Sequence, residues 1–373
     1  MSRLRSLLQV FRTGLVAFAI VSLTIPSLAS GADSASQFLS ENFDGADSYY
    51  ASGPTGNADG SYKTGSILGG NNSCSDCQEG CCDSPRIGDV MVESIFGHPN
   101  PDCWTPLTLS TLFSEGWRES WVPSPNGSGG APRQGWINAT DGNLYRLNFF
   151  TFAQGFNNSQ QPDAYLGAYT LYTPFSRRLL LITNVPFVLR NNASNGLPTI
   201  DPQSQSVVSQ SQTTFGDISF TPRVLLHETK DFSLTAEMTV LVPTGNQPLA
   251  GKAALVPTVG FWYNIAGGWV IRGGIGDFIS TNGDGTNNLI SQLAIGQTLS
   301  AHDVPVFGDF TYYFSAVATT PLSSGNGATS VSLTPGIRTH VGNDWYFLAG
   351  LPTPLTTQRV ADLGMILWFM KAW

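Results

Sequence analysis

The chain has 373 residues, of which only 12% are charged and 41% are hydrophobic, and its formal net charge is −8. An acidic protein lacks the basic surface that nucleic acid requires, so the composition argues against a nucleic-acid partner. So few charges also argue against a large soluble protein built of strands, whose solvent-facing sides would carry more of them.

The first 29 residues are predicted to be a signal peptide. Arg3, Arg5 and Arg12 precede or flank an apolar run at 14–25, and Ser27-Leu28-Ala29 supplies the small residues of a cleavage site. The run is shorter than the roughly 20 apolar residues of a membrane-spanning helix. We therefore expect export, after which the mature chain is still more acidic.

Residues 30–142 are predicted to form an acidic, loop-rich N-terminal segment. They carry fourteen Asp and Glu against four Lys and Arg, whereas residues 143–373 carry twelve against eleven. The segment is rich in Gly, Ser, Asn and Asp and shows little periodicity, which is typical of irregular structure.

All five cysteines lie in this segment, four of them closely spaced. Such thiols can bind zinc, whereas export into an oxidising compartment favours disulfides. We expect disulfides and assign no metal, and the pairing stays open. The candidates are Cys74, Cys77, Cys81, Cys82 and Cys103.

Residues 232–242 give the clearest strand pattern of the chain. Apolar residues occupy every second position from Phe232 to Val242, and polar residues lie between most of them. At about 3.3 Å per residue such a strand crosses, on a tilted path, a hydrocarbon core of about 30 Å. A strand of a soluble sandwich would also alternate, so the rest of the chain has to decide.

Similar segments recur to the end of the chain and are separated by strong turn formers. Short and long connections alternate, as in an up-and-down meander. Pro222, Pro257 and Pro335 lie inside predicted strands, where a residue without an N–H interrupts the ladder. The predicted strands are 143–156, 163–174, 178–190, 215–228, 231–243, 252–265, 268–279, 289–300, 304–319, 328–341, 344–351 and 359–373.

Two features favour a membrane barrel over a sandwich. The faces opposite the polar ones are apolar, and aromatic residues lie near predicted strand ends, as in transmembrane barrels. These aromatic residues are Trp269, Trp345, Trp368 and Trp373. The last strand alternates to Trp373 and is similar to the C-terminal signature that the barrel assembly machinery of bacteria recognises, although Lys371 replaces an apolar residue and is expected to reach the headgroups. The predicted fold is all-β: a transmembrane antiparallel up-and-down β-barrel of about 12 strands over 143–373, after an irregular cysteine-containing N-terminal segment.

Short motifs add a family resemblance over about residues 140–373. They are Phe215-Gly216-Asp217-Ile218 with Pro222, Val242-Pro243-Thr244-Gly245, Pro257-Thr258-Val259-Gly260-Phe261-Trp262, and Phe307-Gly308-Asp309-Phe310. Together they resemble the family of outer-membrane transporter barrels associated with the meta-pathway of phenol degradation. The resemblance implies a channel for small, often hydrophobic or aromatic molecules, and it does not extend to the cysteine-containing segment.

In such a barrel the polar faces line the lumen, and inward charges set selectivity through their local field. Each of these charges could also be a paired lumen charge with a structural role, and a register shift of one residue would turn it outward. The lumen-lining candidates are Asp217, Arg223, Glu237, Arg272, Asp309, Arg338, His340 and Asp362.

The sequence therefore predicts a channel-like or transporter-like barrel in the bacterial outer membrane that passes small molecules without catalysis. The expected partners are outer-membrane lipid, the barrel assembly machinery and a small-molecule solute. No catalytic residue, metal or cofactor is predicted. The N-terminal segment would be a plug, a periplasmic cap or a partner contact. The alternatives are a soluble secreted β-sandwich that binds carbohydrate or a surface partner, and a structural envelope anchor.

Overall fold

A computed structural model describes residues 86–156, 164–191, 214–244, 253–281, 287–322, 328–356 and 362–373. The predicted signal peptide and four of the five cysteines lie outside these ranges, so both the peptide and the disulfides stay predictions. Cys103 is exposed and has no disulfide partner among the described residues.

The described chain begins with one α-helix and two short 3₁₀-helices. These are α4 (Ile87–Phe96), η2 (Pro101–Cys103) and η3 (Ser128–Gly130). None of the helices in the described ranges is long and apolar enough to cross a membrane.

The remaining elements are strands. They are β1 (Leu147–Phe156), β2 (Ala164–Pro174), β3 (Leu179–Asn191), β4 (Thr214–Phe215), β5 (Ile218–Glu228), β6 (Phe232–Val242), β7 (Ala254–Ala266), β8 (Trp269–Ser280), β9 (Asn287–Thr298), β10 (Gly308–Pro321), β11 (Ser330–Gly342), β12 (Trp345–Gly350), β13 (Thr353–Pro354) and β14 (Leu363–Ala372). Apart from the two-residue strands β4 and β13, these are twelve long strands.

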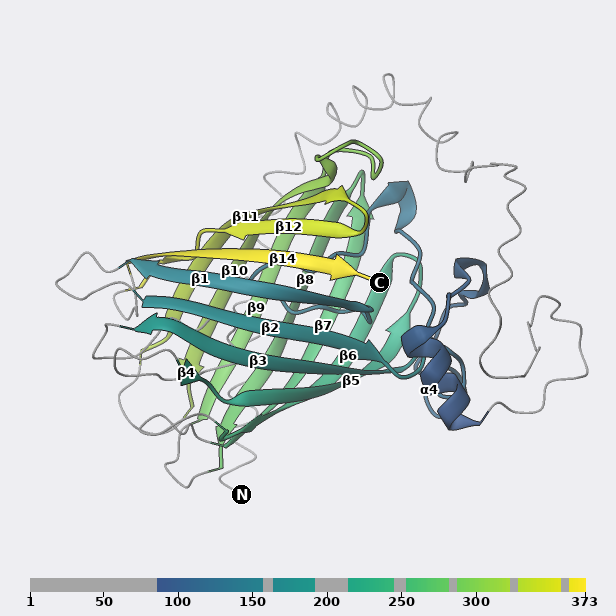
Figure 1. Ribbon diagram of the computed structural model, residues 1–373, viewed down its shortest axis with the longest axis horizontal. Helices are drawn as coiled ribbons and strands as arrows, with labels where there is room; N and C mark the ends of the chain where they lie inside the picture. The colour runs from purple at the N-terminus through teal and green to yellow at the C-terminus, as the bar shows by residue number, and fades with distance from the viewer. Residues whose placement is uncertain are drawn as a thin grey trace, which may run out of the picture. The chain divides into compact units, whose positions relative to one another are not determined.

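The twelve long strands form one closed antiparallel barrel, which confirms the predicted fold class. Strands that follow one another in the chain pair with one another, and β1 pairs with β14 from Leu147↔Ala372 to Phe156↔Leu363. Figure 1 shows the first and last strands side by side in the wall. Closure gives every wall strand two neighbours, so the alternative of a β-sandwich is wrong.

The connections differ at the two ends of the barrel. At one end, to the right in Figure 1, the turns are short, and β7 and β8 are joined by Gly267 and Gly268 alone. We call this the short-turn end and the opposite one the long-loop end. Both glycines have positive φ, which a tight hairpin turn requires.

The strand boundaries agree with the predicted ones to within a few residues, with four exceptions, one of which is the start of β14 at Leu363 rather than 359. β1 begins at Leu147 rather than 143, because the preceding residues lie inside the barrel. β10 begins at Gly308 rather than 304, and the predicted strand 215–228 is divided into β4 and β5.

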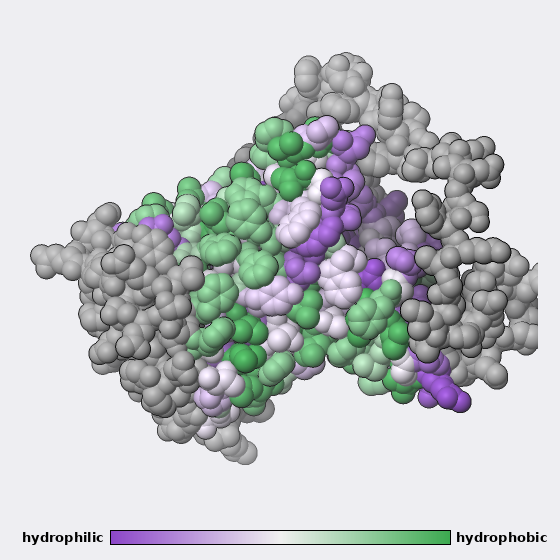
Figure 2. Space-filling model, viewed as in Figure 1, coloured by the Kyte–Doolittle hydropathy of each residue, from purple (hydrophilic) through white to green (hydrophobic). Residues whose placement is uncertain are grey.

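The wall has an apolar outside and a mostly polar inside. In β6 the side chains of Ser233, Thr235, Glu237 and Thr239 are buried inward, whereas Met238 is exposed on the outer face. Figure 2 shows the outer face of the wall as a broad hydrophobic band. This pattern matches a barrel that faces lipid outside.

The three strand prolines lie where the ladder to one neighbour is interrupted. Each is on the outward-facing phase of its strand. Pro222 lies in the gap from Phe220 to Arg223 in the pairing of β5 with β6, and Pro257 lies in the gap from Leu255 to Thr258 in the pairing of β7 with β8. Pro335 lies between Leu333, where the pairing of β11 with β13 ends, and Gly336, where its pairing with β12 begins. A missing N–H is tolerated at such gaps.

The predicted position of one tryptophan is wrong. Trp368 lies on the inward phase in the body of β14, where its ring stacks on Phe149 at 4.6 Å between centroids. Trp345 and Trp373 do lie exposed at the short-turn end. Lys371 extends to the β11–β12 turn, where its ammonium contacts Asn343 O and lies 3.8 Å from Asp344.

An arginine introduced on the outer face of β1 tests whether that face contacts lipid. Phe152 is 39% exposed in the middle of β1 and faces outward. We expect Phe152→Arg to destabilise the barrel by about 2–4 kcal/mol, because a lipid-facing arginine near the midplane costs that much. The measurement is denaturant unfolding in bilayers, followed by heat-modifiable gel migration.

The matched control is Asn148→Arg, on the same face but near the end of β1, where the cost falls to about 0–1 kcal/mol. Equal destabilisation by the two variants would contradict a lipid-facing outer band.

Candidate functional site

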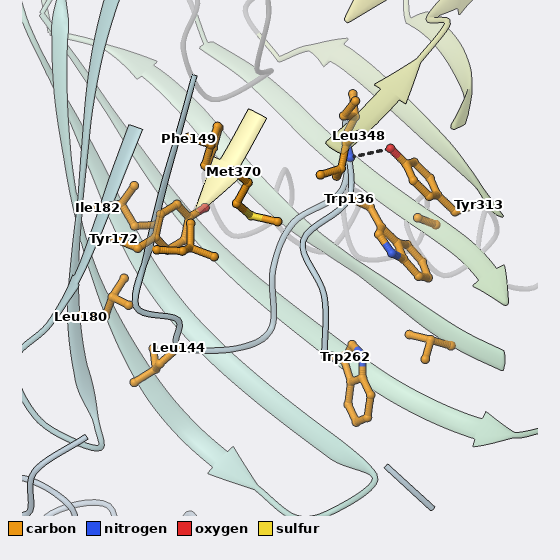
Figure 3. Packing of buried hydrophobic residues seen from close by; sticks show 14 of the residues in the cluster. Trp136, Leu144, Phe149, Tyr172, Leu180, Ile182, Trp262, Tyr313, Leu348 and Met370 are labelled. Atoms are coloured by element: carbon orange, nitrogen blue, oxygen red, sulfur yellow. Dashed lines mark hydrogen bonds between the residues drawn. The ribbon is translucent and has the colours of Figure 1, made fainter. Parts of the chain in front are cut away.

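The barrel lumen contains a loop from the same chain. Residues 131–146, which we call the plug loop, enter from the short-turn end, and most of their side chains are buried among inward-facing wall residues. Figure 3 shows Trp136 of this loop beside Tyr313 of the wall. The lumen is therefore occupied, and the loop is the centre of the candidate site.

The tip of the plug loop packs on β10 and β11. The rings of Trp136 and Tyr313 stack in parallel at 5.2 Å, and Ile137 N donates to Tyr313 Oη at 3.2 Å. Asn138 has a positive φ, which asparagine tolerates at a turn, and its Nδ2 donates to Thr334 Oγ1 at 2.8 Å. These contacts fix the tip against one side of the wall.

Arg272 of β8 binds both limbs of the plug loop. Its side chain is fully buried, and Nε and Nη2 donate to Thr140 O at 3.2 and 3.0 Å. Its Nη1 donates to Gln134 O on the other limb, and Nη2 forms an ion pair with Asp141. One guanidinium, which offers five donors in a fixed geometry, thus holds the loop in its turn.

Arg223 of β5 completes the ionic cluster around Asp141. Its Nε donates to Glu237 of β6 at 2.6 Å, and its Nη1 lies 4.0 Å from Asp141. Nη1 also donates to Asn143 O at 3.0 Å. Buried charges require such partners, because an unpaired one costs several kcal/mol.

A second polar cluster fixes the limb that leads into β1. Asn143 Oδ1 accepts from Arg133 Nη1 and from Ser233 Oγ, both at 2.6 Å. Arg133 also lies 3.3 Å from Glu228, at the end of β5. Burial lowers the pKa of Arg133, although Glu228 opposes that shift.

Inward-facing glycines make room for the plug loop. A Cβ at Gly260 would lie 2.5 Å from Thr140 Cγ2, and one at Gly274 would lie 2.9 Å from Thr140 Cβ. A Cβ at Gly296 would come within 2.9 Å of the Trp136 ring. Only residues without a side chain fit at these wall positions while the loop is in place.

Two cavities flank the plug loop. One, of about 80 Å³, lies on the long-loop side and is lined by aromatic and small polar groups, among them Trp136, Tyr172, Trp368, Asn184 and Ser219. The other, of about 220 Å³, lies on the short-turn side between the loop and β11, β12 and β14. The loop separates the two spaces.

The structure brings together only some of the predicted lumen residues. Arg223, Glu237 and Arg272 meet around Asp141, and Arg338 is buried on the inward face of β11. Asp217 is buried and Asp362 precedes β14, both at the long-loop end.

The two remaining candidates form a separate group near the short-turn end. Asp309 Oδ2 lies 2.7 Å from His302 Nδ1, and the His302 and His340 rings stack at 4.2 Å. Asp309 lies at a register shift between β10 and β11 and has a positive φ.

The residues of the plug loop itself were missed by residue-level prediction. Asp141, Gln134 and Trp136 fall in the segment whose role was left open between plug, cap and partner contact. No signal in the sequence singles them out, because the three arginines on the predicted inward positions are already matched by four carboxylates, those of Asp217, Glu237, Asp309 and Asp362. No group of three His, Cys, Asp or Glu in the described ranges could hold a metal ion.

One family model matches more than half of the chain. A family model described as "Putative MetA-pathway of phenol degradation" matches residues 144–362. No curated protein matches the chain.

Among solved structures, an outer membrane channel from Pseudomonas putida F1 is similar at 11% identity and a TM-score of 0.45, over 64% of this chain and 99% of that one. The toluene transporter TbuX of Ralstonia pickettii is similar at 9% identity and a TM-score of 0.27, over 76% and 97%. OmpT of Vibrio cholerae is similar at 9% identity and a TM-score of 0.29, over 61% and 98%.

The buried carboxylate of Asp141 gives a first test of the site. We expect Asp141→Asn to weaken docking of the plug loop by about 3–5 kcal/mol, because it leaves Arg272 without its buried counter-charge. Hydrogen exchange should speed up at the amides of residues 131–146 while wall amides stay protected. Asp102→Asn, at an exposed carboxylate, is the control. Unchanged exchange in Asp141→Asn would contradict this anchoring role.

The stability of the contact between Ser128, which precedes the plug loop, and Asp231 in the β5–β6 turn should depend on pH. Burial raises the pKa of Asp231, but hydrogen bonds from Asn264 and from Ser128 outweigh burial, so the pKa lies below its ordinary value of 3.8. The stabilisation is therefore complete above about pH 3.8 and is lost as the pH falls through the lowered pKa.

We expect exchange at Ser128 N, corrected for intrinsic rates, to increase in that acidic range. Asp231→Asn should abolish the pH dependence. An equally steep increase in this variant would assign it to another group.

Proposed function

The chain belongs to the family described as "Putative MetA-pathway of phenol degradation", and from this we propose that it is an outer-membrane channel for small hydrophobic or aromatic molecules that is closed by its own plug loop. The observation that carries the proposal is the plug loop, which divides the lumen into two cavities and is held there by non-covalent contacts.

The lining of the long-loop cavity supports the class of solute. Phe149, Tyr172 and Trp368 offer ring faces, and Asn184 and Ser219 offer hydrogen-bonding groups. Such a mixture suits a small molecule with an apolar ring and one or two polar atoms. The volume of about 80 Å³ that this cavity has while the plug loop is in place suits only a small molecule.

Passage requires movement of the plug loop. A barrel of twelve strands is narrow, and here the loop fills its middle. The anchors are hydrogen bonds and ion pairs around Arg272 and Asp141. These can exchange for water when the loop moves, whereas the closed wall stays intact.

A reversible lock tests the proposal. In the double variant Thr140→Cys with Gly274→Cys, the Cβ atoms start 2.9 Å apart and need about 3.5–4.5 Å. The new Cβ at Gly274 also lies 2.7 Å from the main-chain oxygen of Val259, so both the loop and β7 must shift slightly. We expect entry of benzenesulfonate, an aromatic probe whose permanent charge keeps it from crossing the bilayer itself, to fall at least tenfold in proteoliposomes when the disulfide forms and to recover on reduction.

Each single-cysteine variant, oxidised and reduced, is the control for the native cysteines. Mass spectrometry verifies the crosslink. If the solute entered equally fast in the locked and the reduced states, the proposal that the plug loop closes the channel would be wrong. No entry in the reduced state would favour the structural envelope anchor.

A further inference from the structure

The short-turn cavity has an unusual charge balance. Three arginines line it, namely Arg133, Arg146 and Arg338, and no aspartate or glutamate does. Arg133 is neutralised by Glu228, and Arg146 donates to the main-chain oxygens of Ser94 and Gly97. Neither Arg146 nor Arg338 forms an ion pair among the described residues, but only Arg338 of the three also keeps buried donors without an acceptor there.

Arg338 is 5% exposed, and its Nε and Nη1 have no hydrogen-bond partner among the described residues. Its guanidinium lies over the ring of Tyr346, 4.1 Å from the centroid. Arg338 also hydrogen-bonds to the side chain of Tyr346, so this bond and the stacking hold the plane of the guanidinium while Nε and Nη1 keep donors without a partner. Asp309 also acts on Arg338 electrostatically, but it is bonded to His302 and does not line the cavity.

Two further residues that line the same cavity carry donors. Gln134 Oε1 accepts from Trp136 Nε1 and from Thr311 Oγ1, so the amide nitrogen points the other way. That nitrogen, Nε2, is buried without a partner in the described part of the chain. Tyr145 Oη accepts from Asn143 Nδ2, which leaves its own proton to donate, and burial raises the pKa of Tyr145 so that the proton stays on.

The remaining walls are apolar or aromatic. Trp121, Leu144, Tyr346 and Met370 surround the donors, in a space of about 220 Å³. An inorganic anion would meet the donors and leave these walls without contacts. A small ring that bears a carboxylate would use both.

We propose that the short-turn cavity is a binding site for small aromatic carboxylates, in which the guanidinium of Arg338 donates a charge-assisted hydrogen bond to the carboxylate and Gln134 donates a second. The ring lies between Trp121, Tyr346 and Met370. This deepens the proposed function, on which it rests, since it places an acidic aromatic solute at the short-turn side of the plug loop. Binding is measured without transport, so the two proposals can fail separately.

The experiment titrates purified full-length protein in detergent with benzoate and follows Trp fluorescence and calorimetric heat. We expect saturable binding of benzoate, with benzyl alcohol, which has the same ring but no charge, at least tenfold weaker. Sulfate should not compete. If sulfate competed at equal concentration, the cavity would be a general anion site and not a site for aromatic carboxylates. If benzyl alcohol bound with equal affinity, the charge of the carboxylate would have no role in binding.

Variants identify the receiving group. Arg338→Gln should lose at least tenfold in benzoate affinity, and Arg338→Lys, which keeps the charge but not the planar group that stacks on Tyr346, should lose affinity while its gel migration shows a folded barrel. Gln134→Leu should weaken benzoate more than benzyl alcohol. Arg118→Gln, at an exposed arginine outside the cavity, is the matched control. Wild-type affinity in both Arg338 variants would overturn the proposal.

Discussion

The buried ion pair between Arg272 and Asp141 is the interaction on which the interior depends. A fully buried guanidinium in the middle of a barrel wall is stable only with a counter-charge and with oxygen atoms for its donors. The plug loop provides all of them, through one carboxylate and the main-chain oxygens of Thr140 and Gln134. The same contacts define the two cavities, because they fix where the loop crosses the lumen.

The wall and the plug loop are matched to each other by size as well as by charge. Gly260, Gly274 and Gly296 are unfavourable strand residues on propensity alone. Here each leaves the space that a plug-loop side chain fills. The barrel therefore gives up strand propensity at these positions for a specific internal fit, and the loop is part of the interior packing of the barrel.

The sequence predicted the wall well because strand alternation is local: the eleven residues of β6 carry their two faces in their own order. It placed Arg223, Glu237 and Arg272 on inward phases for the same reason. It did not place Asp141 or Gln134, since their arginine partners are more than 80 residues away and the loop has no periodicity. Trp368 was misplaced because a tryptophan near the chain end resembles a girdle residue, whereas its phase in β14 turns it inward against Phe149.

The attachment of the plug loop to β1 has a consequence for folding. Wall strands pair with their neighbours in the chain, whereas the loop tip meets its partners across long stretches of it, 132 residues from Thr140 to Arg272 and 196 from Asn138 to Thr334. Forming a contact across so many residues first costs the entropy of closing a long loop, and only then does the contact stabilise the chain. We therefore expect the hairpins of the wall to form first and the loop to dock when β1 pairs with β14, so that the last step of folding both closes the wall and fills the lumen.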